Sequence, residues 1–199
     1  MNTEIVFTQV STDSEVQQIL DLQAQNLAAS LTPEIIASQG FVTVKHDPEV
    51  LRQMNRIYPS VIAKSGDTLA GYCLVMPRDF APKVPILAPM FQMLETLSWL
   101  GRPLRESRWF VMGQVCVAED FRGQGVFDGM YQKLREVCRR DFDFVVTEVA
   151  ERNTRSMRAH QRVGFETIHT YPDDTTGEMW HVIAWRFTSK SLVISQRTS

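Results

Sequence analysis

The sequence predicts an α/β fold in which one β-sheet is flanked by helices. Two observations lead to this prediction. Apolar residues recur at helical spacing in some segments and in strand-like runs in others, and the two kinds of segment alternate along the chain. The dipeptide Gly66-Asp67 stands between two apolar runs, as in the turn of a β-hairpin, so the sheet is expected to begin with antiparallel strands.

The N-terminal elements are marked by their caps. Thr12 followed by Glu15 forms a capping-box pattern, so a helix is expected from about residue 13 to residue 29. Asp47 before Pro48 predicts the start of a second helix, and the segment between the two helices is expected to be a loop. Strands are expected at residues 5–10, in both arms of a hairpin within 60–76, at 109–117 and 142–149, and in two antiparallel runs within 169–187.

Two further helices are expected in the second half, at about 125–140 and at 154–163. The second of these has Asn153 as its N-cap and Gly164 just after its end. Residues 81–108 are expected to be an insertion, because they contain four prolines and an apolar helix-like run that ends at Gly101. The insertion is too apolar to be left in water, and three roles stay open: covering a substrate cavity, contacting a second copy in a homodimer, or packing on the chain's own sheet.

Composition restricts the class of protein. With 199 residues, of which 44% are hydrophobic, residues 1–199 are expected to form one domain with the insertion and a polar tail from about residue 188. No apolar run approaches the ~20 residues of a membrane span and no signal-peptide pattern is found, so we expect a cytoplasmic protein that does not bind membranes. The net charge of -2, with basic residues spread along the chain, gives no indication of nucleic-acid binding. Cys73, Cys116 and Cys138 lie in apolar stretches, so neither a disulfide nor a metal site is expected.

The most informative motif is the sequence Arg122-Gly123-Gln124-Gly125, between the strand-like QVCV and a helix. Glycine permits a tight turn, and the unpaired N–H groups of a first helical turn favour negative charge. A pyrophosphate suits such a turn, although for these four residues alone a structural turn beside a solvated arginine stays an alternative. A dinucleotide-binding fingerprint would require a small residue where Asp128 stands, and the GK[ST] ending of a Walker loop is absent.

The segment from Val115 to Phe165 resembles the GCN5-related N-acetyltransferase (GNAT) family. Residues 122–127 match its [Q/R]-x-x-G-x-[G/A] motif, except that Phe127 replaces the final glycine or alanine. The preceding VCVAEDF and the later N-x6-H-x3-GF pattern agree as well, and the order of elements agrees from residue 4 to residue 187. The resemblance implies a mostly antiparallel sheet whose fourth and fifth strands are parallel and splayed apart. It also implies acetyl-CoA as cosubstrate, without a metal.

The resemblance assigns residues to acetyl-CoA. Val115, Cys116 and Val117 match the strand whose backbone pairs with the acetyl and pantetheine amides. The turn that holds the pyrophosphate is matched by Arg122, Gly123, Gln124, Gly125, Val126 and Phe127. Asn153 matches an asparagine that binds the pantetheine arm or caps the next helix. Because the turn binds through its backbone, the change at Phe127 leaves the N–H donors in place.

Glu148 is the candidate general base. It matches a glutamate that serves in this way in some members of the family, through a water molecule, and period-2 counting places it on the same strand face as Phe144 and Val146. Apolar surroundings raise the pKa of a carboxyl group towards a useful range. An ordinary salt bridge with Arg152 or Arg155 is the alternative.

His160 is the candidate acid, because it stands where the family often has a tyrosine near the thioester sulfur. A histidine with an ordinary pKa of about 6.5 can protonate a leaving thiolate. The alternative is a packed histidine that fills the volume of the tyrosine. A covalent acyl intermediate on Cys116 is not expected, because apolar neighbours raise the pKa of a thiol.

In the family the acceptor enters opposite CoA, which corresponds here to residues 30–46 and 171–180. Aromatic and acidic side chains in these segments suit a cationic amine or a peptide N-terminus: Phe41, Tyr171, Asp173, Asp174, Glu178 and Trp180. The alternative is that the acidic residues only form a solvated turn.

The sequence therefore predicts an N-acetyltransferase that transfers an acetyl group directly from acetyl-CoA to a primary amine of a small molecule, peptide or protein. Two alternatives remain. One is a module that binds CoA with little or no turnover, and the other is transfer of a longer acyl chain or transfer to a non-amine acceptor. Turnover on amines distinguishes them.

Overall fold

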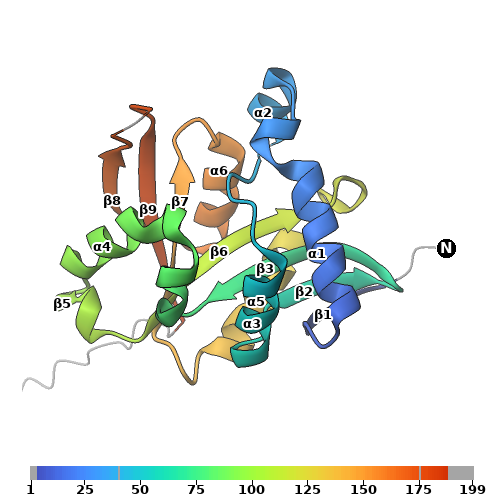
Figure 1. Cartoon of the computed structure of the whole chain (residues 1–199), viewed down its shortest axis with the longest axis horizontal. Helices are drawn as coiled ribbons and strands as arrows, with labels where there is room; N and C mark the ends of the chain where they lie inside the picture. Colours follow the sequence, from blue (N-terminus) through green and yellow to red (C-terminus); the bar gives the residue numbers. More distant parts are fainter. Residues whose placement is uncertain (1–3, 40, 175, 188–199) are drawn as a thin grey trace, which may run out of the picture.

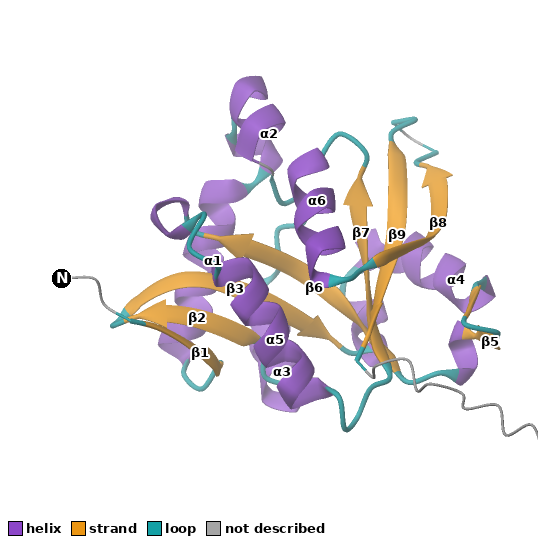
Figure 2. Cartoon of the chain, turned by 180° about the vertical axis from the view of Figure 1, so that it is seen from behind, coloured by secondary structure: helices purple, strands orange, loops and turns teal. Residues whose placement is uncertain are grey.

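The computed structural model describes residues 4–39, 41–174 and 176–187, and it consists of a twisted β-sheet between two layers of helices (Figure 1). The helices of one layer pack their buried side chains on one face of the sheet: α1 (Asp13–Asn26), α3 (Pro48–Ile57) and α4 (Ala88–Thr96). The other face is covered by α5 (Val126–Cys138) and α6 (Thr154–Val163), which lie in front of the sheet in Figure 2.

Seven strands form the sheet in the order β1-β2-β3-β6-β7-β9-β8. Their bounds are Ile5–Gln9 for β1, Val61–Ser65 for β2, Thr68–Met76 for β3, Trp109–Val117 for β6, Phe144–Ala150 for β7, Glu166–Pro172 for β8 and Met179–Arg186 for β9. All neighbouring strands are antiparallel except β6 and β7, which are parallel. The expected mixed, mostly antiparallel sheet is therefore confirmed, with β6 and β7 as its fourth and fifth strands.

The predicted caps form as the sequence suggested. Thr12 and Glu15 make the reciprocal capping box at the start of α1, and the Asp47 carboxylate accepts hydrogen bonds from the first turn of α3. Asn153 caps α6, and Gly164 ends that helix with a φ of 115°. Gly66 has a φ of 60° in the β2–β3 turn, so the hairpin prediction is confirmed too.

The parallel pair β6–β7 is short. Its register joins Trp109 to Phe144 and Val111 to Val146, and beyond this point the two strands diverge, as Figure 1 shows. The pairing of β3 with β6 contains a register shift at the same level, where Gly113 and Gln114 of β6 lie opposite the single residue Leu74. A bulge of this kind bends the strand that carries the extra residue, which turns β6 away from β7. The sheet therefore opens a gap between its two central strands.

The predicted insertion packs on the chain's own sheet. It contains α4, a small hairpin of β4 (Ser98–Trp99) and β5 (Arg102–Pro103), and three short 3-10 turns, at Arg78–Lys83, which begins just before it, at Pro85–Leu87 and at Leu104–Glu106. Met90, Phe91, Leu94 and Leu104 are buried in the same core as Trp109 of β6. Packing on the chain's own sheet was one of the three roles that the sequence left open, and it accounts for the apolar content of the insertion.

The expected loop between α1 and α3 contains a helix, α2 (Pro33–Gln39), that the sequence analysis missed. The tail from residue 188 lies outside the described residues. None of the helices in the described part of the chain has the length and apolar character needed to cross a membrane.

Candidate active site

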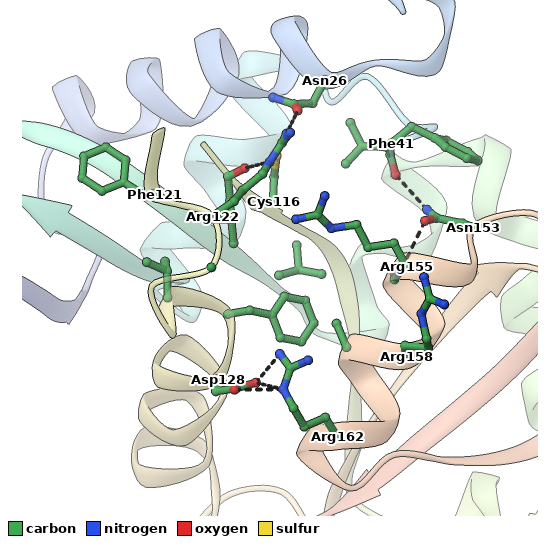
Figure 3. A pocket seen from close by; sticks show the side chains of 18 of the residues that line it. Asn26, Phe41, Cys116, Phe121, Arg122, Asp128, Asn153, Arg155, Arg158 and Arg162 are labelled. Atoms are coloured by element: carbon green, nitrogen blue, oxygen red, sulfur yellow. Dashed lines mark hydrogen bonds and ion pairs between the residues drawn. The ribbon is translucent and has the colours of Figure 1, made fainter. Parts of the chain in front are cut away.

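Two cavities meet at the gap between β6 and β7. The larger has a volume of about 500 Å³ and lies between the end of β6, the turn before α5, and α6 (Figure 3). The smaller has a volume of about 80 Å³ and lies between β6, β7 and the start of β9. Both are lined by Phe41, Val42, Val115, Asn153 and Ser156, so a molecule in one cavity can reach a molecule in the other through the gap.

The turn before α5 presents backbone N–H groups to the larger cavity. Gly123 and Gly125 both have a φ of 76°, in the left-handed region that glycine adopts without strain, and a Cβ atom at either position would meet open space. Gly125 is the N-cap of α5, and no side chain caps this end of the helix. The first N–H groups of α5 and the positive end of its dipole are thus directed at the cavity, which is a suitable arrangement for a phosphate group.

Arg122 ties this turn to its surroundings. Its Nε donates to the Val117 carbonyl at 3.2 Å and a terminal nitrogen donates to Asn26 Oδ1 at 2.9 Å, so the guanidinium joins the end of β6 to the end of α1 (Figure 3). The arginine of the RGQG motif is therefore part of the cavity wall and holds the shape of the turn, which rules out the alternative of a solvated side chain.

The cavity brings together most of the residues predicted to bind the cofactor. Val115, Cys116, Val117, Arg122, Gly123, Gly125, Val126, Phe127 and Asn153 all line it. Gln124 does not, since its amide points back and donates to the Asp120 carbonyl at 2.7 Å. Burial raises the pKa of the Cys116 thiol to about 12, as the sequence analysis expected, which disfavours an acyl-cysteine route.

The sequence analysis missed three arginines of α6 that line the same cavity: Arg155, Arg158 and Arg162. Arg162 forms a bidentate ion pair with Asp128 in the first turn of α5, with N–O distances of 2.9 to 3.2 Å. Figure 3 shows Arg155 reaching from α6 into the cavity, with Arg158 beside it. Their spacing of three and four residues places the three arginines on one face of the helix, so the sequence already indicated a basic face on α6.

Phe127 fills the space between α5 and α6. Its ring lies 5.0 Å from that of Tyr131 and 5.1 Å from that of His160, and the cluster continues to Phe165 and Trp185. The two departures from the family motif, Phe127 and His160, therefore contact each other edge to face. Phe127 packs between the helices and leaves the N–H donors of the turn accessible.

His160 is almost fully buried, and both of its ring nitrogens have protein partners. Nδ1 lies 2.8 Å from the Ser156 carbonyl, which only accepts, so Nδ1 carries the proton. Nε2 then accepts from the Tyr131 hydroxyl at 2.7 Å. Burial lowers the pKa of His160 to about 4, so the ring is neutral near pH 7. This geometry gives His160 no proton for a departing thiolate and corresponds to the packed histidine that was the alternative.

Glu148 lines the smaller cavity from β7. Desolvation raises the pKa of its carboxyl to about 7, and a hydrogen bond of 2.8 Å from the Tyr171 hydroxyl partly opposes that shift. Arg152, one of the two arginines considered as a salt-bridge partner, instead pairs with Glu178 at 2.5 Å. A half-buried carboxylate that titrates near neutrality is well suited to accept a proton from an amine.

Residues 41–46, which we call the strap, cross the gap and contribute to both cavities. The strap is held at Phe41, whose carbonyl accepts from Asn153 Nδ2 at 3.2 Å and whose ring lies 4.7 Å from the Arg152 guanidinium. Asn153 Oδ1 accepts from the Ser156 N–H, so the asparagine caps α6 and secures the strap at once. Sequence reasoning had no means to find this contact, because Phe41 and Asn153 are far apart in the chain.

A buried polar network fixes the other end of the strap. The Gln114 side chain donates to the Val44 carbonyl at 2.8 Å and accepts from the Tyr72 hydroxyl at 2.6 Å. Gln23 donates to Gln114 and to His46 Nδ1, and accepts from the His46 backbone N–H. Burial lowers the pKa of His46 to about 4, so this histidine is neutral and structural.

The residues predicted for the acceptor side divide into two groups. The aromatic side chains of Phe41, Trp180 and Tyr171 surround or contact Glu148 and its cavity. The acidic ones do not add negative charge there: Asp173 accepts from the Thr176 N–H and hydroxyl within its own turn, and Glu178 is paired with Arg152. Asp174 is exposed.

Comparison with known proteins gives a family and a fold. Residues 29–165 match the model of the acetyltransferase (GNAT) family. No curated protein sequence matches the chain.

Several solved structures share the fold at low sequence identity. The ribosomal-protein-S18-alanine N-acetyltransferase from Escherichia coli has a TM-score of 0.60 at 11% identity, over 96% of this chain and 99% of that one. A putative acetyltransferase from Salmonella typhimurium, solved with its cofactor acetyl-CoA, has a TM-score of 0.61 at 12% identity, over 94% and 96%. A ribosomal-protein-alanine N-acetyltransferase from Brucella melitensis has a TM-score of 0.60 at 16% identity, over 91% and 99%.

Proposed function

The chain belongs to the GNAT acetyltransferase family, and on that basis we propose that it transfers the acetyl group of acetyl-CoA to a primary amine. The observation that carries this proposal is the pair of cavities that meet between β6 and β7, one suited to a phosphorylated cosubstrate and the other containing a carboxylate with a pKa near 7.

The larger cavity suits acetyl-CoA. Backbone donors at Gly123 and Gly125 and at the first turn of α5 match a pyrophosphate, while the end of β6 offers Val115 to Val117 to the pantetheine arm. When acetyl-CoA is bound in this way, its acetyl-bearing end reaches the gap between β6 and β7, and the thioester lies next to the smaller cavity.

Glu148 is then the base. An amine is protonated near pH 7 and must lose a proton to become nucleophilic, and the Glu148 carboxylate takes that proton directly or through one water molecule. The amine nitrogen forms a bond to the thioester carbon, the carbon–sulfur bond breaks, and the sulfur leaves as a thiolate. The nitrogen then loses its second proton to solvent, so that the products are a neutral amide and the CoA thiolate. Holding both reactants at the gap supplies a large part of the rate enhancement, on the order of several kcal/mol of barrier.

The protein does not use His160 to protonate the thiolate, since both ring nitrogens are engaged and the ring is neutral. A CoA thiol has a pKa of about 8.5, like that of a cysteine, so a thiolate is an acceptable leaving group near neutral pH without a dedicated acid.

The size and the aromatic wall of the smaller cavity limit which amines can act as acceptor. Its volume of about 80 Å³ admits the amine and a few neighbouring atoms, and the aromatic side chains of Phe41 and Trp180 at its wall suit a cation. The bulk of the acceptor therefore stays outside the cavity, as it would for the end of a peptide or for a long amine.

A screen of purified protein with acetyl-CoA against small amines and peptides with free N-termini, read as thiol release, tests the proposal. We expect turnover on a subset of primary amines, rising with pH through about 7 as Glu148 loses its proton.

The second candidate function is a CoA-binding module with little turnover. One observation favours it: both ring nitrogens of His160 are hydrogen-bonded within the protein. Tight acetyl-CoA binding without acetylation of any amine or peptide would support that candidate and contradict the enzyme.

A further inference from the structure

Ser156, in the first turn of α6, lies at the point where the two cavities meet. Five of the described residues line both cavities, and three of them, Phe41, Val42 and Val115, have no hydrogen-bonding group in their side chains. The fourth, Asn153, is held by the Phe41 carbonyl and by the backbone N–H of Ser156. The half-buried Ser156 therefore brings a hydroxyl group to the gap between β6 and β7.

The contact with His160 determines how the Ser156 hydroxyl is used. His160 Nδ1 carries a proton, because it lies 2.8 Å from the Ser156 carbonyl, and the same Nδ1 lies 3.3 Å from Ser156 Oγ. Oγ is thus the acceptor in this contact, and its own proton is not used there. In the part of the chain that the structure describes, no protein acceptor takes this proton. The hydroxyl is therefore available to donate to a group in the gap.

The proposed reaction develops negative charge at this place. With acetyl-CoA bound in the larger cavity and its thioester at the gap, the sulfur lies where Ser156 lines both cavities, and it becomes a thiolate as the carbon–sulfur bond breaks. A hydrogen bond to a charged group is stronger than one between neutral groups. The positive end of the α6 dipole also favours negative charge beside the first turn of this helix.

We propose that Ser156 is a catalytic residue whose hydroxyl donates a hydrogen bond to the sulfur as it leaves. The proton stays on the serine oxygen, so the sulfur still departs as a thiolate. Because this hydrogen bond is stronger to the developing thiolate than to the neutral thioester, it accelerates the reaction. The donor to the leaving group thus lies one helical turn before His160. This inference rests on the proposed function, since it requires acetyl-CoA in the larger cavity.

The test titrates the thiol of bound CoA with pH in the wild type, in Ser156→Ala and in the control Thr154→Ala. The thiolate is followed by its ultraviolet absorbance, and the complex with desulfo-CoA, which lacks the sulfur, supplies the reference spectrum. Thr154 is exposed at the start of α6 and lines neither cavity, so its variant removes a hydroxyl that lies away from the gap. Thermal unfolding of each variant checks that the fold is intact.

We expect the thiol pKa of bound CoA to be higher in Ser156→Ala than in the wild type by about one to two units, the size of one hydrogen bond to a charged group. Thr154→Ala should match the wild type. The affinity for desulfo-CoA, measured by titration calorimetry, should agree within about twofold in all three proteins, because this ligand has no sulfur to bind. The single-turnover rate of Ser156→Ala with an amine acceptor should fall about tenfold or more.

Two results would overturn this inference alone: equal thiol pKa values in Ser156→Ala and the wild type, or an unchanged single-turnover rate in Ser156→Ala. In both cases CoA is still bound, and the proposed function stays in place. A wild type that binds neither CoA nor desulfo-CoA would overturn the proposed function as well.

Discussion

The two cavities at the β6–β7 gap differ in how they are built. The larger one is formed by a local motif, with its glycine turn, the first turn of α5 and the arginines of α6, and it is basic. The smaller one is assembled from segments distant in the chain, the strap, β6, β7 and β9, and its functional group is one desolvated carboxylate. Under the proposed function, cosubstrate binding depends on backbone geometry and net charge, whereas acceptor chemistry depends on a few side chains whose positions are set by tertiary contacts.

The largest effect that would sharpen this comparison is expected from Glu148→Gln. Removing the base should lower kcat/KM on an amine about 10²- to 10⁴-fold, the usual range for loss of general-base catalysis, and should leave acetyl-CoA affinity unchanged because Glu148 lines only the smaller cavity. Steady-state kinetics and titration calorimetry measure the two quantities.

Glu151→Gln is the matched control, since Glu151 is exposed on the turn just after β7. It should leave both quantities near wild type. A Glu148→Gln enzyme with more than about half of the wild-type kcat/KM would show that position alone, without a base, explains the reaction.

The next largest effect is expected on stability, from His160→Phe. This change leaves the buried Tyr131 hydroxyl without its acceptor, which should lower the free energy of unfolding by about 1–3 kcal/mol. The kcat should stay within about threefold of wild type, because the neutral, engaged His160 donates no proton. Chemical denaturation and single-substrate kinetics measure these effects.

A double variant, Tyr131→Phe with His160→Phe, removes both partners of the hydrogen bond and should be less destabilised than the sum of the two single variants.

The pH dependence of stability gives an independent check on His160. The pKa of His160 falls from 6.5 to about 4 on folding, so the wild type should lose stability as pH falls through this window, and His160→Phe should lose less. A large drop in kcat with unchanged stability would restore the acid role.

These two predictions bear on how much of the site the sequence can predict. The residues of the glycine turn were found because a turn signature is local, and so were the caps at Thr12, Asp47 and Asn153. Glu148 was proposed as the base because the sequence resembles the family, but its partner Tyr171 and the strap residue Phe41 contact it or its cavity only through tertiary folding. The role of His160 depended on the Tyr131 hydroxyl, which no spacing in the sequence indicates.

Two features were missed although the sequence contained a signal for them. Thr32 precedes Pro33 at the start of α2 in the same way that Asp47 precedes Pro48 at the start of α3, but a helix of seven residues is too short to show a clear apolar periodicity. The arginines at 155, 158 and 162 share one face of α6, but their use against a cavity becomes apparent only when α5 lies opposite.

A smaller effect is expected from Gly125→Ala. A Cβ at this position meets open space, so the cost comes from the left-handed backbone alone, about 1–2 kcal/mol. For a chain of this size that corresponds to a fall in Tm of roughly 2–8 °C. Acetyl-CoA affinity should fall as well, because the strain is relieved by moving the donors of the turn.

Gly177→Ala is the control, with a φ of 69°, open space around its Cβ and a position in the β8–β9 turn away from the larger cavity. It should lower Tm by a similar amount and leave acetyl-CoA affinity unchanged. Equal losses of affinity in both variants would contradict a specific role of the turn.

The smallest effect is expected from Tyr171→Phe. The Tyr171 hydroxyl donates to Glu148 and holds its pKa below the value that desolvation alone would give, so its removal should raise that pKa further. The acidic limb of the kcat/KM profile should move to higher pH by less than about one unit, the size of one neutral hydrogen bond. If the acidic limb of the profile stays at the same pH while kcat falls, Tyr171 acts on the acceptor and not on Glu148.

The central claim, that the larger cavity binds acetyl-CoA, is tested most directly by thermal unfolding with and without this cosubstrate. At about 100 times the dissociation constant, one-site binding to the folded state adds about 2.7 kcal/mol of stability. The account therefore predicts a saturable rise in Tm of roughly 5–10 °C. An unchanged Tm at millimolar acetyl-CoA would contradict it and would leave the glycine turn with a purely structural role.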